Sequence, residues 1–251
     1  MEREAAVHEA GQGYDASPFL PTARAGLPGL RRAAADCRGC PLFLDATRTV
    51  FGEGPAHARL MLVGEQPGDQ EDRRGEPFVG PAGRLLREAL DEAGLGDEEA
   101  YVTNAVKHFK FTLAPRGKRR VHKAPSLREM TACRPWLVRE LRLVDPDVLV
   151  VLGGTAGRAL LGSSFRVGER RGVLLPMPRL HGADGGAEGE AGAGADGGTG
   201  RGTERGRDPG ADPTGQLLAT VHPSAVLRAD DRKAAYAGLV ADLSVAATVL
   251  T

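Results

Sequence analysis

Apolar residues along the chain form short runs separated by amphipathic and polar segments. β-Strands are expected at five apolar runs of strand length: residues 59–64, 101–106, 147–153, 172–175 and 216–221. Helices are expected where apolar residues recur at helical spacing: residues 27–36, 84–93, 155–161 and 232–249. Ser126 and Glu129 have the spacing of a capping box, so a further helix should begin there. Pro135 should kink that helix or divide it in two.

The alternation of strands with helices predicts an α/β fold. We expect a three-layer α/β/α sandwich around a central, parallel-rich sheet of about four strands. The run DVLVVLG, residues 147–153, is so apolar that it should be a central strand covered on both faces. Loops at the carboxyl ends of such strands form the binding site, and four loops carry unusual polar residues: 64–72, 103–109, 117–122 and 221–228.

Length and composition indicate one domain, residues 27–251, after a flexible tail at residues 1–26. Residues 182–215 interrupt it with 13 of the 35 glycines, seven acidic residues, three arginines and no large apolar side chain. Such a segment cannot bury enough apolar surface to offset the entropy of ordering, so we expect a disordered insertion. It carries a net charge of −4, which leaves +4 on the rest of a chain that is neutral overall.

No uninterrupted apolar stretch has the length expected of a membrane span, and residues 1–14 lack the layout of a signal peptide. We therefore expect a cytoplasmic protein with no membrane partner. Because 33 basic residues balance 33 acidic ones, the overall charge does not by itself indicate nucleic-acid binding.

Three cysteines, Cys37, Cys40 and Cys133, argue against a disulfide framework in a reducing compartment. The C-R-G-C spacing of the first two is typical of a pair of metal or cluster ligands. With three cysteines a four-cysteine site is impossible, so a metal centre would need another kind of ligand or an open position.

The segment GKRRVHKAPS, residues 117–126, sets His122 between basic residues. A neutral imidazole is both a nucleophile and a metal ligand, although a histidine beside arginines is more often a simple phosphate contact. Its role must therefore be judged from the rest of the chain.

Taken together, the four loops resemble the uracil-DNA glycosylase superfamily, specifically its iron–sulfur branch. Within that branch the chain is similar to the UdgX group, which becomes covalently attached to uracil-containing DNA. The resemblance rests on GEQPGDQED, on KH after NAV and on KRRVH, and it extends from about Leu27 to the C-terminus without the insertion. Gln66 and His108 stand where conventional members have GEAPG-like and KCRPP-like sequences.

The resemblance implies a binding site for uracil in DNA, with the single-stranded form favoured. A target base must leave the stack and be read by its edge and by stacking. Asn104 can match the donor and acceptor of uracil, and Phe78 is the implied stacking platform. From position alone, a strand-end asparagine could instead form a turn and a loop phenylalanine could belong to the core. Further contacts to base or phosphate are implied for Gly64, Ser224, Lys118, Arg119 and Arg120.

The same resemblance implies a catalytic set. His222 would donate to uracil O2 as negative charge develops there, and Glu65 would stabilise the sugar cation. Gln66 and Asp69 would hold the loop and the nucleophile. His122 would then bond to C1′ and leave the protein attached to the abasic sugar after one turnover. The alternatives are a conventional glycosylase of the same branch that turns over, and a non-catalytic uracil-DNA binding protein.

A four-iron four-sulfur cluster is the implied cofactor, with Cys37, Cys40, Cys133 and His108 as ligands. Zinc also accepts three cysteines and one histidine, so it is the competing metal. We expect a monomeric DNA-repair protein associated with the nucleoid in the cytoplasm.

Overall fold

The computed structural model describes residues 13–96, 100–115, 117–180 and 212–250, and is built around one five-stranded sheet. The strand order is β2-β1-β5-β7-β6, in which only β6 runs antiparallel to its neighbour. The bounds are β1 Leu60–Gly64, β2 Ala100–Asn104, β5 Val148–Leu152, β6 Leu174–Pro176 and β7 Gln216–Thr220. The expected parallel-rich sheet is confirmed, with β6 as the fifth strand at the edge.

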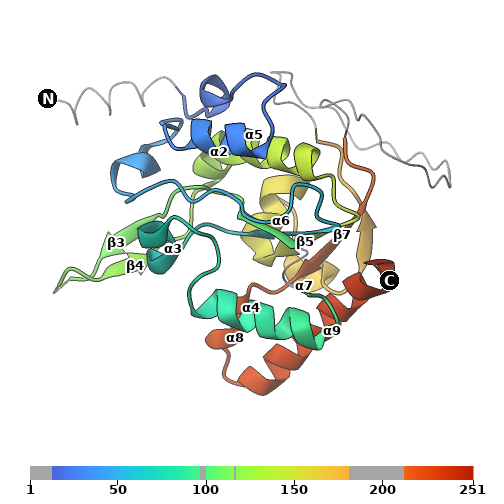
Figure 1. Ribbon diagram of the computed structural model, residues 1–251. Coiled ribbons are helices and arrows are strands. Elements are labelled where there is room, and N and C mark those ends of the chain that lie inside the picture. Colours follow the sequence, from blue (N-terminus) through green and yellow to red (C-terminus); the bar gives the residue numbers. More distant parts are fainter. Residues whose placement is uncertain (1–12, 97–99, 116, 181–211, 251) are drawn as a thin grey trace, which may run out of the picture.

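Helices cover both faces of the sheet (Figure 1). Met61 and Val63 of β1 face one apolar cluster, whereas Leu60 and Leu62 face another, because successive side chains of a strand point to opposite sides. The first cluster is closed by α5 Leu127–Val144 and α6 Gly153–Leu161, and the second by α4 Pro81–Glu92, α8 Pro223–Leu227 and α9 Arg232–Leu250. The predicted three-layer α/β/α sandwich is therefore confirmed.

The basic segment is not simply a loop. It forms an antiparallel hairpin of β3 Phe111–Leu113 and β4 Arg120–His122, which projects beside α3 Asp69–Arg74 (Figure 1). Neither the hairpin nor α3 was expected from the apolar pattern. Both are too short and too polar to produce a periodic signal.

Helix α5 begins with the predicted capping box: the Ser126 hydroxyl accepts from the Glu129 N–H, and the Glu129 carboxylate accepts from the Ser126 N–H. The helix continues through Pro135 without dividing, contrary to one of the two expected outcomes. Trp136, Leu137 and Leu141 beyond the proline are fully buried, and this packing compensates for the missing backbone hydrogen bond. The remaining helical segments are Ser17–Phe19, α2 Leu27–Ala34, Pro41–Leu44 and α7 Val167–Arg170.

Two expectations about flexible segments concern residues partly outside the described ranges. Residues 1–12 of the predicted tail and 181–211, which include most of the predicted insertion, lie outside them. The described part of the tail is packed: Ala16 is buried and its N–H donates to the carbonyl of Ala132. Likewise Asp212 accepts from the Leu180 N–H and lies 3.5 Å from Arg142, so residues 212–215 join the folded domain.

One helix in the described part of the chain, α9, is long and apolar enough by length and composition to cross a membrane, with a mean hydropathy of 1.3. The sequence analysis expected no such segment. Leu239 and Leu243 of α9 belong to the core, and Asp242 on the same face pairs with Arg171 at 2.8 Å. Through these contacts the apolar face of α9 packs against the rest of the domain.

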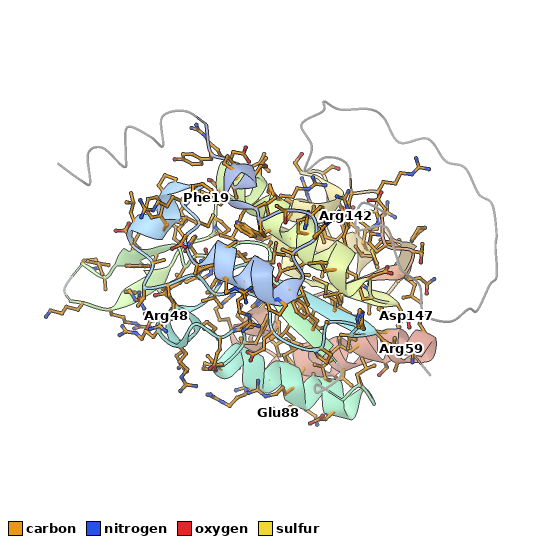
Figure 2. All side chains as sticks on the ribbon, turned by 45° about the horizontal axis from the view of Figure 1, so that its top comes forward. Phe19, Arg48, Arg59, Glu88, Arg142 and Asp147 are labelled. Atoms are coloured by element: carbon orange, nitrogen blue, oxygen red, sulfur yellow. The ribbon has the colours of Figure 1, made fainter. Side chains whose placement is uncertain are left out.

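The two ends of the sheet differ in character. At the amino ends of β1 and β5, Arg59 and Asp147 form an exposed ion pair of 2.6 Å. Figure 2 shows this pair on the side of the molecule opposite the hairpin. The hairpin and the polar loops instead gather at the carboxyl ends of the strands.

Candidate active site

Three parallel strands deliver polar side chains to one edge of the sheet. Glu65 follows β1, Asn104 ends β2, and His222 lies just beyond β7. The register pairs Gly64 with Asn104, and Ala105 N–H donates to the Gly64 carbonyl at 2.9 Å. The parallel arrangement therefore brings together the loops that the sequence analysis singled out.

Gly64 has no side chain, and this leaves room beside it for the side chains of Asn104 and Phe78. A Cβ atom at Gly64 would lie 2.4 Å from Asn104 Oδ1 and 2.7 Å from the ring of Phe78. Any larger residue would displace both groups. Asn104 and Phe78, each almost fully buried, thus line the same point at the end of β1.

Phe78 is held in an uncommon backbone conformation, with φ at 55°. Its carbonyl packs so closely on α4 that a Cβ at Gly83 would lie 1.6 Å from it, and Arg87 Nη1 donates to the same carbonyl at 3.2 Å. Left-handed backbone at a bulky residue persists only where its surroundings enforce it. The Phe78 ring lies 6.3 Å from the ring of His222, with an angle of 28° between their planes.

The hydrogen bonds of His222 define its tautomer. Nδ1 accepts from the backbone N–H of Ser224 at 3.1 Å, which caps α8, so the ring proton is on Nε2. Burial lowers the pKa of His222 to about 4, and the charges of Arg228 and His122 act in the same direction. The ring is therefore a neutral N–H donor near neutral pH. Ser224 supports it directly, since its hydroxyl oxygen lies 2.8 Å from Nδ1.

The hairpin brings His122 to the same edge. His122 Nε2 lies 3.3 Å from Glu65 Oε1, and its ring centroid is 6.1 Å from that of Phe109. The His122 side chain is 50 % exposed, whereas Glu65 is 22 % exposed. Glu65 Oε1 itself is buried, with no hydrogen-bond partner among the described residues. Such an unsatisfied carboxylate oxygen is suited to receive a proton or to face a positive charge.

Gln66 fixes the base of the hairpin. Its amide nitrogen donates to the carbonyls of Lys110 and Lys123 at 3.1 and 3.2 Å, and its oxygen accepts from the Lys110 N–H at 3.1 Å. Lys123 N–H also donates to the Lys110 carbonyl. A single buried amide thus ties both strands of the hairpin to the end of β1, one residue from Glu65.

Arg120 fixes the hairpin along its length. Its guanidinium donates to carboxylate oxygens of Asp69 and Asp72 and stacks over the ring of Phe111, 4.9 Å from the centroid. Burial tends to raise the pKa of Asp69, but hydrogen bonds from Arg73 and Arg120 more than offset this and lower the pKa below its usual range. The guanidinium is therefore bonded within the protein. The phosphate contact expected for Arg120 stays a prediction.

Lys118 and Arg119 lie at the turn of the hairpin and are exposed to solvent. Together with exposed Lys123 they are three exposed cations among the described residues of the segment that carries His122. Solvated cations at this position can attract phosphate groups. Their expected role as DNA contacts remains a prediction.

The three cysteines belong to one buried apolar cluster, which also contains Val106 just beyond β2. All are free and buried, and burial raises the pKa of each thiol, that of Cys40 to about 11. For Cys133 the charge of Lys107 opposes this rise in pKa, whereas charges on Cys40 and Cys37 add to it. Trp136 Nε1 donates to Cys37 Sγ at 3.2 Å, and Lys107 N–H donates to Cys133 Sγ at 3.3 Å. N–H donors aimed at buried sulfurs suit the thiolates of a metal or iron–sulfur centre.

His108 directly follows Lys107, the residue whose N–H donates to Cys133 Sγ. Its Nε2 is 2.9 Å from the hydroxyl of Thr49, which donates its own proton to the Ala34 carbonyl at 3.0 Å. Nε2 must then carry the ring proton, which leaves a lone pair on Nδ1. Burial lowers the pKa of His108 to about 4, so the ring is neutral. Among the described residues, however, no three or more His, Cys, Asp or Glu side chains are arranged to hold a metal ion.

A buried ion pair below the site was not predicted from the sequence. Lys107 and Glu140 form an ion pair with side chains 1 % and 0 % exposed. Asp72, which anchors Arg120, was missed as well. The helical spacing of Asp72 from Asp69 was a usable signal, whereas nothing in the pattern distinguished Lys107 from a solvated lysine.

Comparison with known proteins agrees with this geometry. The family model described as "Uracil DNA glycosylase superfamily" matches residues 51–244. The chain is 42 % identical over 120 residues to a type-4 uracil-DNA glycosylase of Thermotoga maritima, covering 48 % of this chain and 58 % of that protein. It is 35 % identical over 146 residues to a type-4 uracil-DNA glycosylase of Pyrobaculum aerophilum, covering 58 % and 70 % respectively. A type-5 uracil-DNA glycosylase of Mycobacterium leprae is 30 % identical over 165 residues, 54 % of this chain and 70 % of that protein. The alignment with the Thermotoga maritima protein thus spans less than two thirds of that relative.

Proposed function

Because the chain belongs to the uracil-DNA glycosylase superfamily, we propose that it excises uracil from DNA and remains covalently attached to the abasic sugar through His122. The observation that carries this proposal is the 3.3 Å separation between His122 Nε2 and the buried oxygen of Glu65. An imidazole beside a carboxylate, at the edge where the base-reading side chains converge, is suited to nucleophilic attack.

Recognition of the base is assigned to Asn104 and Phe78. The Asn104 amide carries both a donor and an acceptor, which match N3–H and O4 of uracil. The ring of Phe78 offers a face for stacking, and its enforced backbone conformation supports a fixed position for that face. Gly64 leaves the room between them.

Cleavage of the C1′–N1 bond leaves negative charge on uracil and positive charge on the sugar. Nε2–H of His222 would donate to uracil O2 as this charge grows, and its low pKa keeps the ring a neutral donor. The Glu65 carboxylate would stabilise the cationic sugar from the other side. A preorganised donor and a preorganised carboxylate together lower the barrier, because neither has to be reoriented as the charge develops.

Capture of the sugar is assigned to His122. A lone pair of its neutral imidazole would form a bond to C1′ as the pair of electrons in the C1′–N1 bond leaves with uracil. The resulting alkylimidazolium would be stabilised by Glu65, which can also take up its remaining N–H proton. Tethering the ring next to C1′ raises its effective concentration far above that of a free nucleophile.

For the cysteine cluster we propose an iron–sulfur centre with Cys37, Cys40, Cys133 and Nδ1 of His108 as ligands. The two N–H···S hydrogen bonds and the free lone pair of His108 support this set. When bound, such a centre would hold α5, the β2 end and the CxxC segment together. Purified protein should then show the visible absorption of an iron–sulfur cluster with matching iron and sulfide, whereas colourless protein containing zinc would contradict the assignment.

The proposed partner is uracil-containing DNA, preferably single-stranded, because an unpaired base is less costly to extrude. We further propose that the protein acts as a monomer on nucleoid DNA in the cytoplasm. The exposed cations Lys118 and Arg119 suit contacts to phosphates on either side of the uracil.

A denaturing gel tests the proposed function. The protein is incubated with a single-stranded oligonucleotide containing one uracil, then heated in detergent, while released uracil is measured in parallel. We expect a slowly migrating protein–DNA band and about one uracil released per adduct, and no band with the matched thymine oligonucleotide. Repeated release of uracil without an adduct would instead indicate a conventional glycosylase, and binding without release a non-catalytic protein.

A further inference from the structure

A buried charge pair lies directly beneath the base-reading edge. Lys107, in the turn after β2, and Glu140, on α5, are among the least exposed side chains of the protein. Charges in such a position are strongly destabilising unless every polar atom has a partner. The way in which these atoms are satisfied therefore indicates what the pair does.

All three donors of the lysine ammonium group are used within the protein. Nζ donates to Thr103 Oγ1 at 2.7 Å, to the Asn104 carbonyl at 2.8 Å, and to Glu140 Oε2. An ammonium group has three protons, so its capacity is filled. One of the three bonds is directed at the backbone of the residue that is proposed to read uracil.

The glutamate completes the same network. Glu140 Oε1 accepts from the Tyr101 and Thr103 hydroxyls, both at 2.9 Å, and from the Gly52 N–H at 3.1 Å. Tyr101 and Thr103 belong to β2. The carboxylate and the lysine ammonium group both bind the Thr103 hydroxyl, and together they hold the final residues of the strand.

Lys107 is also connected to the cysteine cluster through its backbone. Its N–H donates to Cys133 Sγ, and Cys133 and Glu140 both lie on α5. Residues seven apart in a helix fall on nearly the same face. Helix α5 therefore holds Lys107 at two points, by a sulfur at the backbone and by a carboxylate at the end of the side chain.

From these contacts we propose that Lys107 is a positioning residue that sets the orientation of Asn104, with Glu140 as its anchor on α5. This inference rests on the proposed function, because it assigns Lys107 to uracil recognition. Asn104 is the last residue of β2. Its carbonyl accepts a hydrogen bond from Lys107 Nζ at the point where the strand ends. The bond from Nζ fixes the Asn104 peptide plane, and the plane fixes where the side-chain amide points.

A purely stabilising role would not need this directionality. A buried ion pair can often be exchanged for apolar residues of similar volume without loss of stability. Such an exchange would keep the packing below Asn104 but would remove the hydrogen bond to its carbonyl. The double variant Lys107→Met/Glu140→Leu therefore separates positioning from packing, and it leaves no unpaired charge behind.

The experiment measures binding of two single-stranded oligonucleotides by fluorescence anisotropy. One carries 2′-fluoro-2′-deoxyuridine, in which the fluorine slows glycosidic cleavage, and the other carries a tetrahydrofuran abasic analogue. We expect the double variant to weaken binding of the uracil oligonucleotide about tenfold, the size expected for one misplaced hydrogen-bonding group. Binding of the abasic oligonucleotide should be unchanged.

A matched background tests whether the effect passes through Asn104. In the Asn104→Ala protein, adding the two substitutions should cause no further loss of uracil binding, because the group being positioned is absent. Equally weakened binding of both oligonucleotides by the double variant would overturn the inference. It would also be overturned if the triple variant bound the uracil oligonucleotide more weakly than Asn104→Ala alone. Should the Met/Leu pair fail to fold, the Lys107→Gln/Glu140→Gln pair is measured against the same two outcomes.

Failure of the inference and failure of the proposed function give different results. If the wild-type protein releases no uracil and does not prefer the uracil oligonucleotide, the proposed function is lost, and this role of Lys107 with it. If the wild-type protein releases uracil but the double variant retains its full uracil preference, only the role of Lys107 is rejected.

Discussion

Two histidines face the same edge of the sheet on very different supports. His222 is partly buried, caps α8 and is neutral, with both its tautomer and its orientation fixed by Ser224. His122 is 50 % exposed on a two-stranded hairpin and lies beside a carboxylate oxygen that has no hydrogen-bond partner among the described residues. The first ring is the proposed hydrogen-bond donor to uracil, and the second is the proposed nucleophile.

The difference suggests a division of labour within the site. Groups proposed to read the base belong to the rigid sheet edge, whereas the proposed nucleophile belongs to an appendage secured by Gln66 and Arg120. Catalytic precision improves when functional groups stand on rigid elements. Changes in the hairpin should accordingly leave base recognition intact. The variants of His122, Asn104 and Gln66 described below test this separation.

The largest change is expected at His122. The His122→Ser variant should lose the covalent adduct entirely, because serine lacks the imidazole nucleophile and leaves space for water. Excision should continue and become repetitive, since the sheet edge is untouched. Released uracil per protein and the denaturing gel measure the two outcomes together, and a persistent adduct would identify a different nucleophile.

At Asn104 we expect the reverse result, in which base recognition is lost and the proposed nucleophile stays in place. The Asn104→Ala variant should form adduct about a hundredfold more slowly, because the loss of two paired polar contacts to the base amounts to roughly 3 kcal/mol. His122 would remain in place but would receive little substrate. Single-turnover rates at limiting DNA check this, and rates equal to the wild type would reject Asn104 as the base reader.

A third prediction uses the pKa of the buried ring. The pKa of His222 is about 4 in the folded protein, below the ordinary histidine value of 6.5, so between these values the unfolded chain binds more protons. The free energy of unfolding should therefore fall as the pH drops from 6.5 to 4, by about 3 kcal/mol from this residue. In His222→Asn, which can still cap α8, that part of the loss should be absent in urea melts. Parallel pH profiles for both proteins would contradict it.

A smaller effect is expected at the base of the hairpin. Gln66→Ala removes three hydrogen bonds to the backbone at Lys110 and Lys123, so His122 should be placed less accurately and adduct formation should slow about tenfold. Uracil release measured in the His122→Ser background should be unaffected by the same change. If both fall together, the hairpin is not separable from recognition.

The smallest effect concerns the exposed cations of the hairpin. The Lys118→Gln/Arg119→Gln variant should bind single-stranded uracil DNA several-fold more weakly and reduce the slope of log affinity against log salt by about 1.4. The rate of adduct formation at saturating DNA should not change. An unchanged slope would show that neither cation contacts phosphate.

The fold could be predicted because its core strands are apolar and regularly spaced. The run from Val148 to Leu152 is buried throughout and central in the sheet, as its composition indicated. Strand β3, helix α3 and the packing of Ala16 could not be predicted in this way, because each depends on contacts with residues far along the chain. Pro135 shows the same limit, since buried neighbours keep α5 continuous against a local signal for division.

The site was only partly accessible from the sequence. Asn104, Glu65 and His222 follow the ends of strands, so their convergence could be anticipated from a parallel sheet. Arg120 was expected to contact phosphate, whereas its burial between Asp69 and Asp72 could be seen only once the hairpin was placed against α3. Lys107 and Glu140 carried no sequence signal, because a buried ion pair and a solvated one use the same residues.

Mapping the attachment site most directly tests the central claim. The adduct formed with a uracil oligonucleotide is digested with protease and nuclease, and the modified peptide is sequenced by mass spectrometry. We expect a deoxyribose fixed to the imidazole of His122, with uracil absent from the product. A sugar attached to any other residue, or uracil release with no modified peptide, would contradict it.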